Sequence, residues 1–506
     1  MADMELMASI DIGAHSVRLL IAQVDTADGS YEILEDMEQP IPLGANVFNR
    51  GRISSQSILL MCEIFRNFRM KLDEYGVARY KAIATSAVRE AANADIFIER
   101  LANASGLRVD IFEGVDNARL DYLTAVNSLP SKFGFYKRRT LLASLGTGAC
   151  QLSFYDKGMI ALTQTIRTGT LRILEQISET VSIPIPQLIS PLVVRAFSEL
   201  EHISDDLEAD GLVMMGSSAR ALATISGKHK EETKALVLSR QEFHTLHAKL
   251  LRLSPPEIMR SYGISADLAE ALIPCGVIAR HLLNLTGVKN IAIPLTTTKD
   301  ALLQDFIHDT LKKDDYFEPQ ILSLVARLAE KYHCNDEFSE RTVLFAEKLF
   351  RKLEEIHGLS KKELLLLKIA AQLHKAGLFI NNKSHHKHTY YLISSSEIAG
   401  LSGRQLLLAA LVARYHRRSF PKTSHIEYMA LLPAERSVVN KLASLLRLAC
   451  GLAAACSPEA RLGISISEDA VLLKPEYGTE ALMDNNFIEN DAAFFHYVFA
   501  KKIAFN

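Results

Sequence analysis

The stretch that decides the fold is Ser9-Ile-Asp-Ile-Gly-Ala-His-Ser-Val-Arg-Leu-Leu-Ile21, because two apolar runs flank a glycine turn with small polar residues. This pattern predicts two strands joined by a tight turn. The same order returns at Leu141-Leu-Ala-Ser-Leu-Gly-Thr-Gly-Ala-Cys-Gln-Leu-Ser-Phe-Tyr155. Either stretch alone is typical of an ordinary glycine-turned hairpin. The pair also indicates an internal duplication with one phosphate-facing turn in each of two lobes, and both interpretations stay open here.

The rest of the first 300 residues alternates between strand and helix patterns. Apolar residues at 58, 61, 65, 68 and 72 recur at helical spacing, and Gly76 follows them as a stop signal. Residues 80–84 return to a strand pattern. The alternation predicts a mixed α/β region. We divide it into a first lobe over residues 1–130 and a second lobe over residues 131–310.

After residue 310 the patterns are helical, over residues 338–356, 363–373 and 405–416. Two of these runs follow capping boxes, Ser360 with Glu363 and Ser402 with Gln405. We therefore expect an all-α domain over residues 311–480 and a C-terminal tail over residues 481–506.

The composition excludes some classes of protein. Lys and Arg number 57 against 59 Asp and Glu, which leaves a net charge of −2 and argues against a uniformly basic nucleic-acid coat. No stretch reaches the roughly 18 apolar residues of a membrane span, and no signal-peptide pattern opens the chain. The six cysteines form no CxxC pair. We expect free thiols and a cytoplasmic location, without membrane or nucleic-acid partners.

Two segments have the residue types of a phosphate site. Asp11 ends the first strand, where a carboxylate could hold Mg²⁺, and Arg18 follows the turn, although an exposed arginine is by default only solvated. Ser86 and Arg89 open an expected helix, which is either an anion site or an ordinary N-cap. The candidate phosphate-binding residues are Asp11, Gly13, His15, Ser16, Arg18, Ser86, Arg89, Gly146 and Gly148.

The strongest charge asymmetry lies between His374 and His425. This segment has eight Lys or Arg and one acid, a local charge of +7 in a chain of −2. Focused positive potential attracts polyanions, so we favour a polyanion groove over a solvated face. The histidines lack zinc-ligand spacing, so a metal site is disfavoured. The groove residues are His385, His386, Lys387, His388, Arg414, Arg417 and Arg418.

These residues together resemble the exopolyphosphatase and guanosine pentaphosphate phosphohydrolase (Ppx/GppA) family in its long form. The match runs through the segments 11–18, 84–93, 114–120, 169–172, 385–393 and 413–417. The resemblance implies an α/β actin-like (ASKHA, ribonuclease H-like) two-lobed core followed by an all-α HD-like domain. It also implies a polyphosphate or (p)ppGpp ligand, dependence on Mg²⁺, and often a homodimer.

Several family positions with chemical roles are substituted here. The family's catalytic Glu, directly before Ala118-Arg-Leu, is Asn117. The second phosphate loop, usually Asp-Ile-Gly-Gly-Gly-Ser-Thr-Glu, reads Ser144-Leu-Gly-Thr-Gly-Ala-Cys-Gln151 and has lost both carboxylates. The later Gly-Thr-x-Gly-Thr loop survives only as Gly216-Ser-Ser-Ala-Arg220. In the helical domain the HD-type ligand positions read Phe338, His374-Lys375 and Cys450.

The substitutions predict that binding outlasts catalysis. A neutral Asn cannot accept the proton of an attacking water, and loss of a general base costs on the order of 10² to 10⁴ in rate. Asp116, one residue earlier, and Glu113 are weak substitutes, because a one-residue shift on a strand or a helix turns the side chain away. We expect a phosphoanhydride hydrolase homologue with impaired catalysis. The alternative is a non-catalytic polyphosphate- or alarmone-binding regulatory protein, and an actin-like ATPase or sugar kinase ranks below both.

Overall fold

The computed structural model describes residues 4–112, 114–177, 185–203, 208–228, 233–311, 315–417, 420–455, 461–476 and 489–505. The chain forms two compact units, Met1–Phe317 and Glu318–Asn506. Each unit is described by itself.

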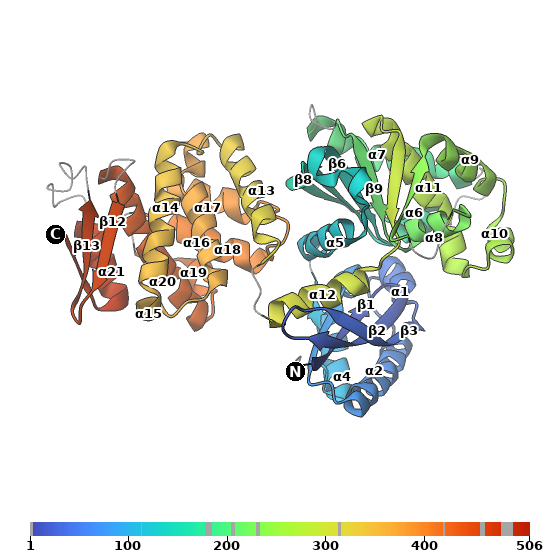
Figure 1. The fold of residues 1–506 in the computed structure, drawn as a ribbon, viewed down its shortest axis with the longest axis horizontal. Coiled ribbons are helices and arrows are strands. Elements are labelled where there is room, and N and C mark those ends of the chain that lie inside the picture. Colours follow the sequence, from blue (N-terminus) through green and yellow to red (C-terminus); the bar gives the residue numbers. More distant parts are fainter. Residues whose placement is uncertain are drawn as a thin grey trace. The chain divides into compact units, whose positions relative to one another are not determined.

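The first sheet of unit 1 is built around the opening hairpin (Figure 1). Its strands are β1 (Met4–Ile12), β2 (Ser16–Asp25), β3 (Tyr31–Pro40), β4 (Arg79–Ala84) and β5 (Asp110–Ile111), in the order β3-β2-β1-β4-β5. Strand β1 pairs antiparallel with β2 and parallel with β4. Helices α2 (Ser55–Tyr75) and α4 (Ala94–Ser105) cover one face, where Phe65, Phe68 and Phe97 enter the core.

The second sheet repeats this arrangement. Its strands are β6 (Arg139–Leu145), β7 (Cys150–Asp156), β8 (Met159–Ile166), β9 (Gly211–Met215), β10 (Ala235–Ser239) and β11 (Asn290–Pro294), in the order β10-β11-β9-β6-β7-β8. The run β8-β7-β6-β9 thus matches β3-β2-β1-β4. In both turns a glycine amide donates to the carbonyl three residues on, Gly13 to Ser16 and Gly146 to Ala149, each at 2.9 Å. The structure confirms the repeated hairpin that the sequence indicated.

Two helices cross between the lobes. Helix α5 (Gly114–Ser128) follows the first sheet but packs against β7 and β11 of the second. Helix α12 (Thr298–Thr310) follows the second sheet but packs against β1, β2 and β4 of the first, where Leu303 and Ile307 join Met7 (Figure 1). The expected second lobe, residues 131–310, therefore includes a helix that belongs structurally to the first.

The remaining α-helices of unit 1 support the two sheets. They are α1 (Leu43–Arg50), α3 (Ser86–Arg89), α6 (Thr170–Ile177), α7 (Ile185–Ile203), α8 (Ser217–Ile225), α9 (Arg240–Leu250), α10 (Pro255–Tyr262) and α11 (Ala266–Thr286).

Unit 2 begins as a helical bundle. Its helices are α13 (Glu318–Lys331), α14 (Glu337–Lys352), α15 (Glu354–His357), α16 (Lys361–Leu373), α17 (His385–Ser394), α18 (Gly403–Arg414), α19 (Ile426–Met429) and α20 (Pro433–Ala455). Both predicted capping boxes are present, at the start of α16 and of α18.

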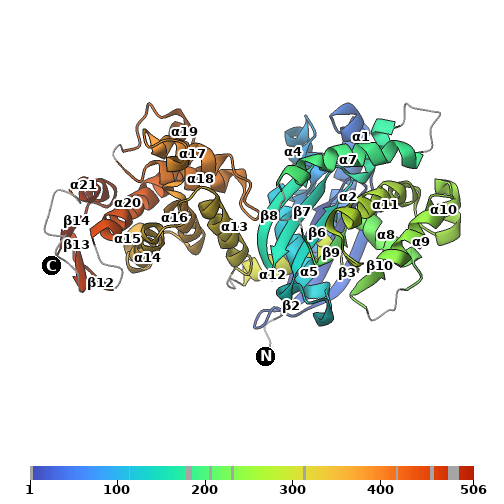
Figure 2. The ribbon, with the colours of Figure 1, turned by 90° about the horizontal axis from the view of Figure 1, so that it is seen from above.

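A small sheet ends unit 2 and corrects the all-α expectation. Strands β12 (Arg461–Ile466), β13 (Ala470–Glu476) and β14 (Lys502–Phe505) pair in that order, and α21 (Glu489–Phe499) precedes β14 (Figure 2). In β13 the period of two buries Val471 and Leu473. The expected tail therefore includes a helix, α21, and the strand that completes this sheet, β14.

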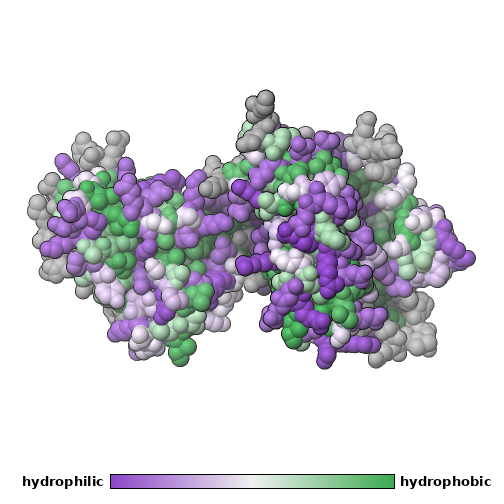
Figure 3. Space-filling view, turned by 90° about the horizontal axis from the view of Figure 1, so that it is seen from below, coloured by the Kyte–Doolittle hydropathy of each residue, from purple (hydrophilic) through white to green (hydrophobic). Residues whose placement is uncertain are grey.

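Among the described residues, two helices, α11 and α20, are long and apolar enough to cross a membrane by length and composition alone. In each, 67% of the most apolar window is buried inside the protein. Hydrophilic and hydrophobic residues are interspersed over the face shown in Figure 3. Cys62, Cys150, Cys275, Cys334 and Cys450 are free thiols, and Cys456 lies outside the described residues.

Candidate functional site

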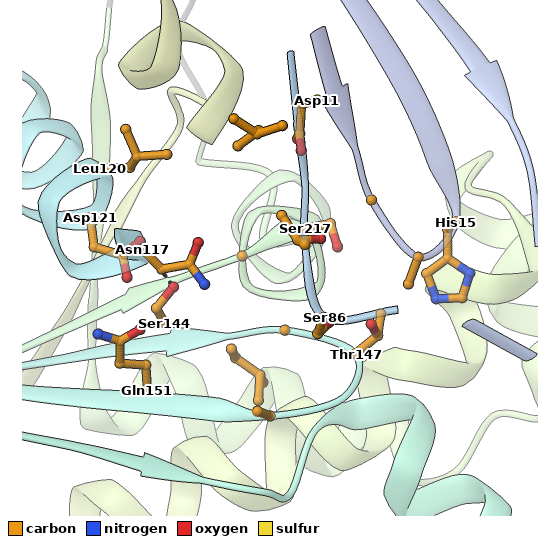
Figure 4. A pocket seen from close by; sticks show the side chains of 18 of the residues that line it. Asp11, His15, Ser86, Asn117, Leu120, Asp121, Ser144, Thr147, Gln151 and Ser217 are labelled. Atoms are coloured by element: carbon orange, nitrogen blue, oxygen red, sulfur yellow. Dashed lines mark hydrogen bonds between the residues drawn. The ribbon is translucent and has the colours of Figure 1, made fainter. Parts of the chain in front are cut away.

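The two glycine turns line one cavity of about 220 Å³ in unit 1 (Figure 4). The first sheet and the segment after β4 contribute Asp11, Gly13, His15, Ser16, Arg18, Thr85, Ser86 and Arg89. Helix α5 contributes Asn117, Leu120 and Asp121, and the second lobe contributes Ser144, Gly146, Thr147, Gln151, Gly216, Ser217 and Arg220. We call this cavity the cleft. It brings together all the predicted phosphate-binding residues except Gly148.

The first turn is tightly built. A Cβ atom on Gly13 would lie 3.2 Å from the Ser16 carbonyl oxygen, so a larger residue would crowd the turn. Ser16 Oγ donates to Glu38 Oε1 at 2.7 Å. His15 Nδ1 lies 3.5 Å from Asp267. Burial lowers the pKa of His15 despite this carboxylate, so the imidazole is neutral at pH 7.

The second turn is held by the backbone that follows β8. The Thr147 carbonyl accepts from the amides of Leu171 at 3.0 Å and Arg172 at 3.2 Å. A Cβ atom on Gly169 would lie 2.2 Å from the same carbonyl oxygen, so only glycine fits there. Gly148 instead faces the Phe48 ring, which a Cβ atom would approach to 2.8 Å. Its role is therefore the packing of the turn against α1.

Three guanidinium groups give the cleft a positive charge. Arg18 pairs with Glu38 at 2.9 Å and its side chain is only 18% exposed, so it is not the freely solvated charge that was the default expectation. Arg89 donates to the Phe112 carbonyl at 2.7 Å, and Thr85 makes no side-chain N-cap bond on α3. Burial, with Arg18 nearby, lowers the pKa of Arg220 to about 10. Arg220 has no ion pair among the described residues, and a bound anion would offset this electrostatic cost.

Gly216 places Ser217 and Arg220 at the cleft. It is the N-cap of α8 with φ of 113°, and a Cβ atom there would lie 2.1 Å from the Leu145 carbonyl oxygen. Sequence reasoning noted this segment as a degenerate loop but left Arg220 out of the candidate site. The signal that could have found it is the four-residue spacing from Gly216, which puts Arg220 in the first turn of the helix.

Helix α5 presents an amide and a carboxyl group to the cleft. Asn117 lines it, whereas Asp116 does not, and Glu113 lies outside the described residues. Asp121, one helical turn after Asn117, lines the cleft with a side chain that is 2% exposed. Ser144 Oγ donates to Asp121 Oδ1 at 3.0 Å. Burial raises the pKa of Asp121 to about 7, against the opposing effect of the Ser144 hydrogen bond. Sequence reasoning missed Asp121.

The candidate polyanion groove of unit 2 contains a buried histidine cluster. The His416 ring centroid lies 5.1 Å from that of His374 and 5.4 Å from that of His385, and all three side chains are buried. Burial lowers the pKa of His374 and His386 to about 4, and that of His416 well below its usual value. The imidazoles of His374, His386 and His416 are therefore neutral at pH 7. A polyanion site here would depend on its lysines and arginines.

The basic side chains of that segment differ in their partners. Arg414 pairs with Glu427 at 3.2 Å, and Arg417 lies 3.4 Å from His385. Lys387 is exposed and His388 is half-buried. Arg418 lies outside the described residues. The groove therefore remains a prediction.

The positions that correspond to HD-type ligands do meet in space. The Phe338 and His374 rings lie 5.8 Å apart, and Lys375 Nζ lies 3.8 Å from the Phe338 ring centroid. Lys375 also pairs with Asp336 at 3.1 Å. An ammonium group here opposes a bound cation. In the described parts of the chain no three His, Cys, Asp or Glu side chains are arranged to hold a metal ion.

The repeated sheets, the crossing helices and the cleft with glycine turns define a two-lobed actin-like core, the fold class that the sequence analysis predicted. Residues 20–308 match the Ppx/GppA phosphatase family, and residues 322–490 match domain III of the Ppx/GppA phosphatases. The chain belongs to the Ppx/GppA phosphatase family, which confirms the resemblance.

Individual relatives are distant. A guanosine-5'-triphosphate,3'-diphosphate pyrophosphatase of Aliivibrio fischeri is 22% identical over 458 residues, 88% of this chain and 86% of the relative. A bifunctional 3-dehydroquinate synthase/phosphatase of Fusobacterium nucleatum is 27% identical over 177 residues, and the match spans 34% of this chain and 26% of that relative.

Solved structures share the core fold. An exopolyphosphatase from Cytophaga hutchinsonii has a TM-score of 0.55 at 19% identity and covers 60% of this chain and 98% of its own. The Ppx/GppA family member of Aquifex aeolicus has a TM-score of 0.51 at 21% identity and covers 62% of this chain and 99% of its own.

Proposed function

We propose that this chain binds the phosphoanhydride end of polyphosphate or of a guanosine polyphosphate in the cleft and hydrolyses it slowly. The observation that carries the proposal is the convergence of both glycine turns with Arg18, Arg89 and Arg220 on one cavity. Guanidinium groups and small turn residues suit phosphoryl oxygens, which are anionic and accept several hydrogen bonds.

The substituted side chains favour anion binding over turnover. Asn117, Ser144 and Gln151 line the cleft where the family's carboxylates would repel a phosphate. Gln151 Nε2 is buried without a hydrogen-bond partner among the described residues, so a phosphate oxygen could accept from it. Neutral donors in these places lower the repulsion, but they remove groups that could take a proton or hold a cation.

The names of the relatives support the substrate class. Relatives of this chain include guanosine-5'-triphosphate,3'-diphosphate pyrophosphatases and an exopolyphosphatase. Both kinds of substrate end in phosphoryl groups joined by anhydride bonds. The cleft features that we describe recognise the phosphoryl end that the two substrates share.

Mg²⁺, which the family resemblance implies, fits the cleft through Asp11. Mg²⁺ sites of phosphoryl-transfer proteins commonly use one or two carboxylates together with substrate oxygens, and Asp11 lines the cleft at the end of β1. When bound, the ion would offset charge on the phosphoryl oxygens.

The alternative is binding without turnover, as a polyphosphate or alarmone sensor. The amide of Asn117 at the position of the family's catalytic Glu favours it. Phosphate release from polyphosphate and from guanosine pentaphosphate, each with Mg²⁺, separates the two functions. Slow release above an Asp11→Ala control supports hydrolysis, whereas a raised melting temperature without release supports the sensor. If neither ligand releases phosphate or raises the melting temperature, both functions are refuted.

A further inference from the structure

Asp121 is the only acidic side chain that is fully buried among the described residues. Burying a carboxyl group is costly unless its polar atoms are paired. Ser144 satisfies Oδ1, but Oδ2 has no hydrogen-bond partner in the described part of the chain. An unpaired, buried carboxyl oxygen beside a cavity is a group kept at a cost in stability, which calls for a functional reason.

The position of Asp121 on α5 gives that reason. Residues four apart lie on the same face of a helix, with Cβ atoms about 5–6 Å apart. Asn117 and Asp121 therefore present their side chains to the cleft from successive turns of α5. Figure 4 shows Asn117, Asp121, Ser144 and Gln151 together on one side of the cavity, with Asp11 and His15 across it. Asp11 and Asp121 are the two carboxyl groups that line the cleft among the described residues.

We propose that Asp121 accepts the proton of the attacking water in this chain, one helical turn from the position of the family's catalytic Glu. The inference rests on the proposed hydrolysis in the cleft. Ser144, which stands where the family has an acid, donates to Oδ1 and so orients the carboxyl group, and Oδ2 is left without a hydrogen-bond partner among the described residues. Asp121 thus connects the two substituted positions, because it lies one helical turn from Asn117 and accepts a hydrogen bond from Ser144.

The chemical step balances with water as the only co-reactant. The water oxygen forms a bond to the terminal phosphorus as the bridging P–O bond breaks, and the electron pair of that bond leaves with the shortened phosphate chain. The water proton passes to Asp121 Oδ2, and Asp121 later releases it to solvent. The products are inorganic phosphate and a chain shorter by one phosphoryl group.

The titratable and charged groups around Asp121 influence the pH at which it is ionised. On β7, Cys150 and Tyr155 interact electrostatically with Asp121, and burial together with Asp121 raises the pKa of both groups, so both are neutral at pH 7. Tyr122 is its neighbour on α5, and β11 has no titratable residue. At the start of α12, Asp300 accepts hydrogen bonds from the amide and the hydroxyl of the N-cap residue Thr297. Asp305 pairs with Arg119, and His308 stacks edge-on against Tyr316. The cleft charges are Asp11, Arg18, Arg89 and Arg220, with His15 neutral.

A carboxyl group in this environment is suited to neutral pH. Burial raises the pKa of Asp121 to about 7, so the ionised base becomes available as the pH rises through neutrality. General-base catalysis is most effective when the pKa of the base lies near the working pH. We therefore expect the rate of phosphate release to rise with pH up to about 8 and then to level off.

The test compares Asp121→Asn with the wild-type chain. The variant keeps the shape and an oxygen that can accept from Ser144, but it cannot take a proton. Asp95→Asn is the matched control, because Asp95 is exposed on α4 and does not line the cleft. Phosphate release from polyphosphate with Mg²⁺ is measured from pH 5 to 9, and polyphosphate affinity is measured separately by calorimetry.

We expect Asp121→Asn to lower the rate of phosphate release on the order of 10² to 10⁴-fold. The rise of this rate with pH should disappear, and the affinity for polyphosphate should change less than threefold. Unchanged rate and pH profile in the variant would overturn the role of Asp121 while leaving the proposed hydrolysis intact. If excess Mg²⁺ restores the rate that the variant has lost, and the rate still rises with pH, the role of Asp121 as a base would also be overturned, since Asp121 would then be a metal ligand. Wild-type binding without any phosphate release would overturn both the role and the hydrolysis, and the sensor function would stand.

Discussion

Replacing Asp121 by Asn is expected to change the pH dependence of stability. The folded chain holds a proton on this carboxyl group up to a pKa of about 7, whereas the ordinary pKa of an aspartate side chain is 3.8. Between these values the unfolded chain is ionised and the folded chain is not. Folding therefore takes up a proton, and the contribution to stability is lost as the pH rises through 7.

The magnitude follows from the size of the pKa shift. About 3 pKa units correspond to about 4 kcal/mol in full, of which about 3 kcal/mol falls between pH 5 and pH 8. The wild type loses this amount over that interval, and Asp121→Asn does not. The cost of burying the Asn amide is the same at both pH values. The difference in the free energy of unfolding between the variant and the wild type is taken at pH 8 and at pH 5. Subtracting one difference from the other cancels that cost and the contributions of all other titrating groups.

The assay is denaturant unfolding at pH 5 and pH 8. Unit 1 is identified as the transition that inorganic tripolyphosphate moves to higher denaturant, because a ligand stabilises only the unit that binds it. Asp95→Asn, which removes an exposed carboxylate outside the cleft, is measured in parallel as the control. A difference between the two pH values below about 0.5 kcal/mol for Asp121→Asn would refute the raised pKa, and with it the physical basis of the proposed base.

Three further substitutions test the cleft. Asn117→Glu restores a carboxylate beside Asp121 and is expected to raise phosphate release at least about 10-fold; an unchanged rate at pH 8 would contradict the link between Asn117 and slow turnover. Arg220→Gln should weaken polyphosphate binding about 10-fold or more in calorimetry, since a charge-assisted hydrogen bond contributes about 1.5–3 kcal/mol, and equal affinities would remove Arg220 from the site. Gly216→Ala should destabilise unit 1 by more than about 2 kcal/mol, because its φ is 113° and its Cβ would meet the Leu145 carbonyl. Gly227→Ala, with φ of 71° and nothing within 4 Å, should cost only about 1 kcal/mol.

Local patterns in the sequence determined the local structure. The glycine turns at Gly13 and Gly146, and the helix starts at Ser360 and Ser402, could be predicted because each depends on hydrogen bonds between residues at most four apart. The substitution of Asn117 was also readable, and the structure places that residue in the cleft.

Tertiary structure alone decided which distant groups meet. Asp121 contacts Ser144, which is 23 residues away on another element, and Arg220 arrives from α8 to share the cavity with Arg18. The packing of α12 on the first sheet and the pairing of β14 with β13 are likewise long-range. Such contacts depend on shape and burial over the whole unit. The raised pKa of Asp121 shows the consequence, because burial, which no local pattern encodes, gives this carboxyl group its chemistry.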